Sequence, residues 1–171
     1  SKMIHISRVH LKLSYPADFM LVGAMNPCPC WYLLDSDRTC TDSKKEIENY
    51  RARLSGPILD RIDLHIRVPR VKPNDKKCNE EFLTTQKALE EVIRIRKIST
   101  QKFWKTNSAL TIQETEELNI TLEAKKALLY AMEKFWLSMR SYHRILRVSR
   151  TIADLWYSDI ITENHIAEAM W

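Results

Sequence analysis

The order of apolar and polar residues divides the chain into a first part with strand and helix patterns and a second part with helix patterns only. Residues 19–25 form a continuous apolar run of strand length, which is typical of a strand buried on both faces of a sheet. Residues 62–68 alternate apolar and polar side chains, which predicts a strand with one solvated face. Between them, residues 43–54 have helical spacing, with Ser43 as a candidate N-cap.

Beyond residue 80 every pattern is helical, with apolar residues recurring at intervals of three and four. Thr111 and Glu114 fit a capping box, and Thr162 is placed to cap the last helix, with Ile161 and Ile166 as a hydrophobic staple. The predicted helices cover 80–98, a short stretch after 111, 121–136, a stretch that starts near 139 and a stretch after 162.

These patterns predict an α/β piece followed by an all-α domain, with a fold that is mainly α overall. We expect the α/β piece over residues 1–70 and the helical domain over residues 80–171. The stretch 71–79 is polar and charged and contains a proline, which predicts a hinge.

Composition adds limits on the class of protein. The chain has 171 residues, of which 44% are apolar and 29% charged, enough for an ordinary folded core. It contains no uncharged apolar run of membrane-spanning length and starts with charged residues, so we expect a soluble, cytoplasmic protein with no membrane partner. The net charge of +5 favours contact with polyanions such as nucleic acid or nucleotide phosphate.

The chain lacks the residues that hold triphosphate and metal in nucleotide-hydrolysing enzymes. Its two glycines, Gly23 and Gly56, do not allow a GxxxxGK[ST] phosphate loop anywhere. It also has no apolar strand that ends in Asp-Glu and would hold Mg²⁺. We therefore expect no nucleotide hydrolysis from this chain alone.

Two polar residues stand next to the predicted strands. Asn26 follows the run 19–25, and ligands of α/β sheets gather beyond the carboxyl ends of strands, although Asn26 also fits a simple turn before Pro27. Arg61 precedes the alternating strand and has a guanidinium that fits phosphate oxygens. Its alternative is an ion pair with Asp60 or Asp63.

The helix that starts near 139 carries Arg140, Arg144 and Arg147 on the side opposite its apolar face. Arg140 lies in the first turn, where the helix dipole does not favour a cation, which indicates an anionic partner. The alternative for all three is a solvated basic face. Phe103 and Trp104 beside Lys105 fit a hydrophobic contact at a helix end better than a site for stacking bases.

Three of the four cysteines gather in a short stretch that ends in an acidic residue: Cys28, Cys30, Cys40 and Asp42. Three thiolates and one carboxylate fit a tetrahedral structural zinc site. The alternative is a loop of reduced cysteines in a reducing compartment. Cys78 stands apart in the predicted hinge.

Three segments together resemble the magnesium-chelatase-like AAA+ ATPases of the ComM/YifB type: FMLVGAMNPCPC at 19–30, RLSGPILDRIDLHIRVPR at 53–70 and SMRSYHRILRVSRTIADL at 138–155. The resemblance implies that residues 1–70 are the C-terminal part of an incomplete AAA+ core and that residues 80–171 are its helical lid. It also implies that Asn26 is sensor 1, Arg61 the arginine finger and Arg140 sensor 2. Proteins of this type often carry cysteine where this chain has Asp42, which is a departure at the metal site.

The resemblance further implies a ring, often a hexamer, in which subunits hydrolyse ATP with Mg²⁺ and in which ComM-type members remodel DNA by branch migration. Two rival functions stay open. One is the motor subunit of a metal chelatase, and the other is a non-enzymatic DNA-binding or adaptor domain.

Overall fold

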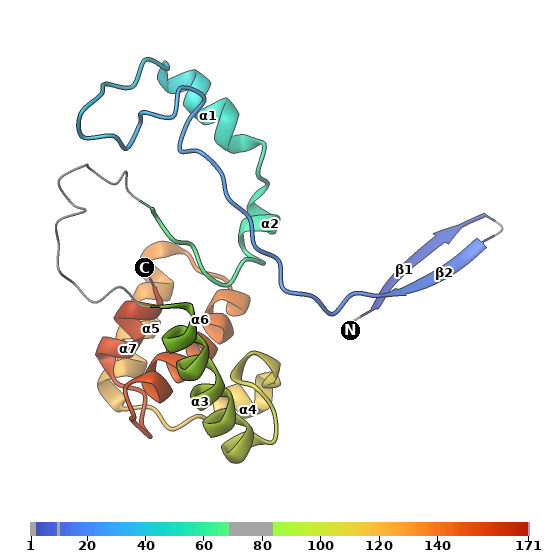
Figure 1. The fold of residues 1–171 in the computed structure, drawn as a ribbon, viewed down its shortest axis with the longest axis vertical. Coiled ribbons are helices and arrows are strands. Elements are labelled where there is room, and N and C mark those ends of the chain that lie inside the picture. Colours follow the sequence, from blue (N-terminus) through green and yellow to red (C-terminus); the bar gives the residue numbers. More distant parts are fainter. Residues whose placement is uncertain (1–2, 10, 69–83, 171) are drawn as a thin grey trace. The chain divides into compact units, whose positions relative to one another are not determined.

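The computed structural model describes residues 3–9, 11–68 and 84–170. It is mainly α, with seven α-helices and one two-stranded sheet among these residues, which confirms the predicted mainly-α class (Figure 1). Two compact units, residues 1–51 and 52–171, are described separately below. The predicted hinge at 71–79 lies outside the described residues.

The first unit begins with a β-hairpin that the sequence reasoning did not predict. Strand β1 (Met3–Arg8) pairs antiparallel with β2 (Leu11–Pro16), and the register places Ile4 opposite Tyr15 and Ile6 opposite Leu13. Apolar residues therefore gather on one face, as period-two alternation requires. The alternation of Ile4, Ile6, Leu11 and Leu13 was the signal that marks this hairpin.

Helix α1 (Lys44–Ala52) confirms the helix expected near 43–54. Its start is held by two reciprocal contacts. The backbone N–H of Glu46 donates to Ser43 Oγ at 3.3 Å, and the backbone N–H of Ser43 donates to the Glu46 carboxylate at 2.8 Å. This is the arrangement of a capping box, and it satisfies two amide groups that have no partner inside the helix.

The strand predictions for 19–25 and 62–68 are wrong, because both segments lack strand structure. A strand needs a neighbour to accept and donate its backbone hydrogen bonds. Within the described residues, the hairpin strands pair with each other and with no other segment. The side chains of Phe19, Met20, Leu21 and Val22 are 70–82% exposed, so the apolar run has no sheet to bury it here.

The second unit confirms the predicted helices, with two differences: α2 was not expected, and residues 80–83 of the predicted helix 80–98 lie outside the described residues. Its elements are α2 (Gly56–Leu59), α3 (Thr85–Phe103), the 3₁₀ turn η2 (Asn107–Ala109), α4 (Ile112–Glu116), α5 (Leu122–Phe135), α6 (Met139–Leu155) and α7 (Glu163–Ala169). The Thr111–Glu114 capping box is present at α4, and Ser138 Oγ caps α6 by accepting from the Ser141 amide at 3.1 Å. At α7, the Thr162 amide donates to His165 Nδ1 at 3.0 Å.

The core of this unit lies around α6 and includes residues from the helices and turns that surround it, among them Leu110, Leu128, Ile145, Leu146, Ile161 and Ile166. Ala124 and Ala153 are fully buried, and their small side chains suit close helix contacts. Ile120 and Ile161 form a single parallel bridge that joins the residues before α5 to those before α7. Burial of these apolar side chains is the main stabilising contribution.

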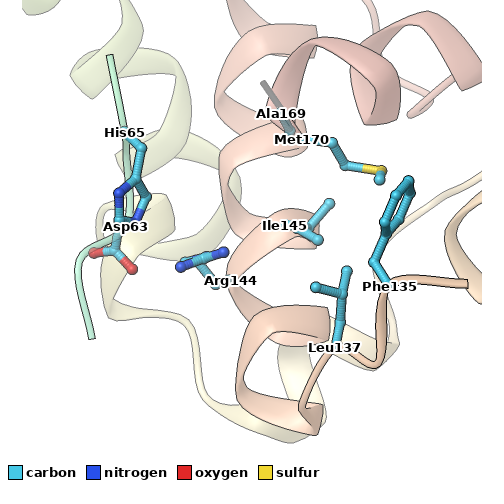
Figure 2. Close-up of a pocket in the computed structure, with 8 residues that line it drawn as sticks. All are labelled: Asp63, His65, Phe135, Leu137, Arg144, Ile145, Ala169 and Met170. Carbon is cyan, nitrogen blue, oxygen red and sulfur yellow. The ribbon is translucent and has the colours of Figure 1, made fainter. Parts of the chain in front are cut away.

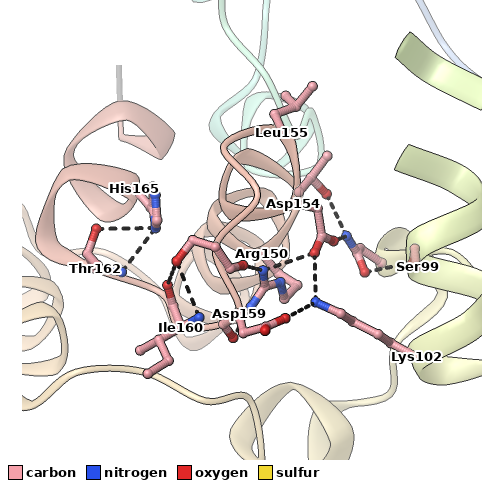
Figure 3. Close-up of polar contacts among 12 residues, drawn as sticks. Ser99, Lys102, Arg150, Asp154, Leu155, Asp159, Ile160, Thr162 and His165 are labelled. Carbon is pink, nitrogen blue, oxygen red and sulfur yellow. Dashed lines mark hydrogen bonds and ion pairs between the residues drawn. The ribbon is translucent and has the colours of Figure 1, made fainter. Parts of the chain in front are cut away.

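Figure 3 shows a buried polar network at the C-terminal half of α6. Arg150 is 2% exposed and donates to the Asp154 carboxylate at 2.9 Å, to the Asp159 carbonyl at 2.8 Å and to the Ser158 carbonyl. Asp154 also accepts from Asn107 Nδ2 at 2.9 Å and lies 3.4 Å from Lys102 Nζ. The buried charges are thus paired, as stability requires.

The end of α3 departs partly from expectation. Phe103 packs against the core, as predicted. Trp104 is 90% exposed and adopts a left-handed φ of 58°, so the predicted hydrophobic contact is wrong for this residue. The αL conformation ends the helix by letting the Trp104 amide donate to the Thr100 carbonyl at 2.8 Å.

Candidate functional site

The four predicted metal ligands come together in the loop of the first unit. The ligand atoms of Cys28, Cys30, Cys40 and Asp42 all lie within 4.8 Å of one another. The Sγ atom of Cys30 lies 3.4 Å from those of Cys28 and Cys40, and the other two are 3.7 Å apart. A tetrahedral zinc ion with ~2.3 Å Zn–S bonds separates its sulfur ligands by about 3.8 Å.

Local backbone contacts bring these residues together. The Cys30 amide donates to Asp42 Oδ2 at 2.9 Å, which joins the two ends of the loop. A turn closes where the Trp31 amide donates to the Cys28 carbonyl at 3.2 Å, with Trp31 at a φ of 74°. Arg51 Nε, near the end of α1, donates to the Pro27 carbonyl at 3.4 Å and ties the helix to the start of the loop.

The electrostatics of the loop favour one thiolate over the others. Burial and the neighbouring Asp42 oppose ionisation of Cys30, but backbone hydrogen bonds at Tyr32 and Thr41 outweigh them, and its pKa is about 7. Burial raises the pKa of Cys40 to about 11 and also raises that of Cys28. The backbone N–H of Cys30 lowers the pKa of Asp42, which stays a carboxylate.

This donor set fits a zinc ion with four protein ligands. Zinc sites with four protein ligands have no open coordination position, and they hold a fold together rather than activate water. Asn26 lies two residues before Cys28 and is exposed, in a segment without helix or strand. It belongs to the first unit, whereas Arg61 and Arg140 belong to the second.

In the second unit, Asp60 attaches the segment of Arg61 to the start of α6. The Asp60 carboxylate accepts from Ser141 Oγ at 2.9 Å and from Ser138 Oγ at 3.2 Å. The Ser141 hydrogen bond is the main reason that the pKa of Asp60 is lowered, with further contributions from Ser138, Arg140 and Arg144. Arg144 adds a second attachment by donating to the Ile62 carbonyl at 2.8 Å.

The two arginines of interest are both exposed. Arg61 Nη1 donates to the Pro57 carbonyl at 2.6 Å. Among the described residues Arg61 forms no ion pair with Asp60 or Asp63, the alternative that its neighbours suggested. The Arg140 guanidinium makes no hydrogen bond to any described residue and interacts electrostatically with Asp60.

The predicted basic stripe of α6 is only partly a surface feature. Arg144 and Arg147 are half-buried, and Arg147 donates to the Leu110 carbonyl at 3.4 Å. Both therefore hold the fold together, and the interpretation of a solvated basic face is wrong for them. Arg140 is the exposed member of the three.

Figure 2 shows a hollow of about 340 Å³ beside this attachment. Asp63, His65 and Arg144 supply its polar wall, and Phe135 and Leu137 lie on its apolar side. His65 is exposed, as expected for a surface histidine. The described lining of the hollow mixes charged and apolar side chains and does not form a known arrangement of catalytic groups.

Sequence reasoning missed Asp60, Ser138 and Ser141 as functional candidates. Both serines lie at the start of the helix expected near 139, but no local signal shows that a carboxylate 78 residues before Ser138 accepts from both hydroxyls. This is a tertiary contact, and the spacing of residues within one segment does not predict it.

Two family models cover most of the chain. The model described as magnesium chelatase, subunit ChlI, matches residues 1–76, and the model described as its C-terminal part matches residues 83–171. The competence protein ComM of Haemophilus influenzae is 40% identical over 98% of this chain and 33% of its own length. The uncharacterized protein YifB of Escherichia coli is 37% identical over 99% of this chain and 34% of its own length.

An uncharacterized protein of Mycobacterium bovis is 32% identical over 82% of this chain and 28% of its own length. The chain therefore spans about a third of the length of the curated relatives that it matches. No helix in the described part of the chain is both long and apolar enough to cross a bilayer.

Proposed function

The chain belongs to the magnesium chelatase subunit ChlI family, and on that premise we propose that it contributes sensor 1, arginine finger and sensor 2 residues to ATP hydrolysis between the subunits of an AAA+ ring. The whole protein would be a DNA-remodelling motor of the cytoplasm. The Haemophilus influenzae relative is named a competence protein, and DNA as the substrate is our proposal for this chain. The net charge of +5 is consistent with a polyanionic partner.

The observation that carries this proposal is the attachment of the Arg61 segment to the first turn of α6. Asp60 accepts from two hydroxyls of that turn, and the exposed guanidiniums of Arg61 and Arg140 are next in sequence to these contacts. Exposed arginines without an ion-pair partner among the described residues suit transient binding of phosphate, since binding breaks no existing pair.

Each residue would have a distinct chemical role. Arg61 would reach the nucleotide of the adjacent subunit and stabilise the charge that develops on the transferred phosphoryl group. Arg140 would bind phosphate oxygens, so that the position of the lid would change with the bound nucleotide. Asn26 would orient the attacking water or donate to a phosphate oxygen in its own subunit.

ATP and Mg²⁺ are the cofactors of this proposal. The donor chemistry of Arg61 and Arg140 fits the phosphate oxygens of ATP, whereas the phosphate loop and the acidic Mg²⁺ ligands are not encoded in these 171 residues. ATP with Mg²⁺ supplies the phosphoryl group and charge neutralisation. The residues of this chain bind and orient that group and stabilise its charge.

We also propose a structural zinc ion held by Cys28, Cys30, Cys40 and Asp42. The sulfur separations of 3.4–3.7 Å support it. The ion would fix the loop that follows Asn26, so that this side chain keeps a constant position at the end of its segment. Asp42 is a harder ligand than cysteine, and zinc accepts carboxylate oxygens at ~2.0–2.2 Å.

The test is ATP turnover by the complete product of the gene with Arg61→Ala. We expect turnover to fall about 10³-fold while nucleotide binding is retained, because an arginine finger acts on the transition state. Arg96→Ala is the matched control, since Arg96 is an exposed arginine of α3, and its turnover should stay near the unmodified value.

The rival functions predict other results. A non-enzymatic DNA-binding domain predicts that Arg61→Ala changes nothing and that binding falls steeply with salt. A metal-chelatase motor predicts the same loss of turnover but binding to a porphyrin-handling partner instead of branched DNA. The cysteine cluster is the feature that favours the DNA-remodelling branch over this motor.

A further inference from the structure

We infer that Asp60 is a positioning residue that holds the arginine-finger segment and the Arg140 helix at a fixed spacing. This inference rests on the proposed function. It adds a residue that neither the family resemblance nor the comparisons assign. Its basis is a set of tertiary contacts between residues 60–62 and the first two turns of α6.

The first step is the geometry of the Asp60 carboxylate. One oxygen, Oδ1, accepts from both Ser141 Oγ at 2.9 Å and Ser138 Oγ at 3.2 Å, and Oδ2 lies 3.4 Å from Ser138 Oγ. Hydrogen bonds to an ionised acceptor are stronger than those between neutral groups. The start of a 17-residue helix also favours a negative charge, so Asp60 suits this place.

The second step is that hydrogen bonds restrain the backbone on both sides of Arg61. Residue 61 follows Asp60 directly, and the Arg144 guanidinium holds the next carbonyl, that of Ile62, at 2.8 Å. On the preceding side, the Asp60 amide donates to the Gly56 carbonyl at 2.8 Å, which closes α2. Arg61 is therefore fixed on both sides, while its own side chain stays exposed.

The third step links this restraint to chemistry. Arginines that act on a transition state contribute only when they are held in the productive geometry, and a misplacement of about 1 Å lowers rates strongly. A segment without helix or strand does not supply such precision by itself. The Asp60 contacts supply it by attaching the segment to the helix that carries Arg140.

The first measurement follows amide hydrogen exchange of residues 56–62 in the 171-residue chain. Asp60→Ala and the double change Ser138→Ala with Ser141→Ala should each speed exchange about tenfold, because each removes the hydrogen bonds to the carboxylate. Ser149→Ala is the matched control on the same helix, and it should leave exchange unchanged, since Ser149 Oγ has no partner among the described residues.

The second measurement follows ATP turnover by the complete gene product. Asp60→Ala should lower kcat at least about fivefold with KM within about twofold, because ground-state binding does not depend on the position of Arg61. Asp60→Asn should recover part of the loss, since its amide oxygen still accepts from Ser141. A purely structural role would not give this split or this rescue.

Unchanged exchange in Asp60→Ala would overturn the inference directly. Faster exchange with normal kcat, in a protein where Arg61→Ala abolishes turnover, would show that the contact exists without positioning the finger, and it would also overturn the inference. Normal turnover in Arg61→Ala would overturn the proposed function and this inference with it. The two failures are thus distinguished by the Arg61 variant.

Discussion

Trp104 and Trp136 end α3 and α5 in the left-handed region, with φ of 58° and 52°. Both residues are more than 89% exposed, so little packing is lost when the side chain is removed. An L side chain costs ~1–2 kcal/mol in this region, and glycine avoids that cost while adding unfolded-state entropy. We therefore expect Trp104→Gly and Trp136→Gly each to raise the free energy of unfolding by about 0.5–1 kcal/mol. Thermal or urea unfolding of the chain measures it.

Trp156 is the matched control, since it also ends a helix but has a φ of −90° and a ring contact with His165 at 5.4 Å. Trp156→Gly should destabilise the chain. Stabilisation by all three changes, or by none, would contradict the explanation from left-handed strain.

Arg150 and Arg140 differ in burial and partners, so their removal should have different consequences. Arg150→Ala leaves Asp154, which is 1% exposed, without its buried cation, and we expect a loss of about 3–5 kcal/mol in the free energy of unfolding. Arg140→Ala should change it by less than about 0.5 kcal/mol. Equal effects in denaturant titrations would contradict the assigned network.

Which arginines are structural was not predictable from spacing. The pattern placed Arg140, Arg144 and Arg147 on one polar side of the helix, but the carbonyl partners of Arg144 and Arg147 come from other segments of the chain. The caps were predictable, because Thr111 and Ser43 bond to residues only three positions away. Local contacts are thus readable from sequence, whereas these tertiary ones are not.

At the scale of elements, the capping box of α4 predicts a pH dependence of stability. The Lys105 ammonium, 2.7 Å from the Glu114 carboxylate, and the Thr111 amide lower the pKa of Glu114 to about 2. A carboxyl with a lowered folded-state pKa stabilises the protein above its ordinary pKa of ~4.5. That stabilisation is lost as the pH falls from 4.5 towards 2.

We therefore expect Glu114→Gln to lower the Tm at pH 7, and the difference from the unmodified chain to shrink as the pH falls through that window. Glu117→Gln, at an exposed position just beyond α4, is the control and should show little difference at any pH. A Glu114→Gln deficit that persists at pH 2 would show that charge is not the cause. Thermal scans across pH provide the data.

Apart from α2, the helices of the second unit were predictable, because each carries a local periodicity or capping signal. The predicted strands at 19–25 and 62–68 were not found, since a strand depends on a partner that its own sequence does not specify. The hairpin of β1 and β2 was overlooked, although its partner lies two residues away. Pairing, rather than apolar pattern, decides whether a segment is a strand.

At the scale of the whole molecule, the cysteine loop should bind zinc. We expect about one zinc ion per chain. Cys30→Ser should abolish zinc binding, whereas Cys78→Ser, a control that also removes one thiol, should retain it. Because zinc binds thiolates, and the pKa of Cys40 is about 11 whereas that of Cys30 is about 7, affinity should fall with falling pH over this whole range and more steeply below pH 7. Zinc that stays bound in Cys30→Ser, by elemental analysis, would contradict the ligand set.

The cluster of four side chains that could hold a metal ion was predictable from the sequence, because Cys28, Cys30, Cys40 and Asp42 are close along the chain. Resemblance also identified Asn26, Arg61 and Arg140 as candidates, but not how Asp60 joins the segments of the two arginines. The coupling runs between residues 60 and 138–141, and contacts between residues so far apart in sequence are set by the fold.

The central claim is that Arg61 acts on the nucleotide of a neighbouring subunit. The most direct test is to mix two inactive variants of the complete gene product, Asn26→Ala and Arg61→Ala. In mixed rings, a subunit with Asn26 can face a subunit with Arg61, so random mixing of equal amounts should restore about a quarter of the unmodified ATP turnover. Activity of the mixture no greater than the sum of the two variants would contradict the claim.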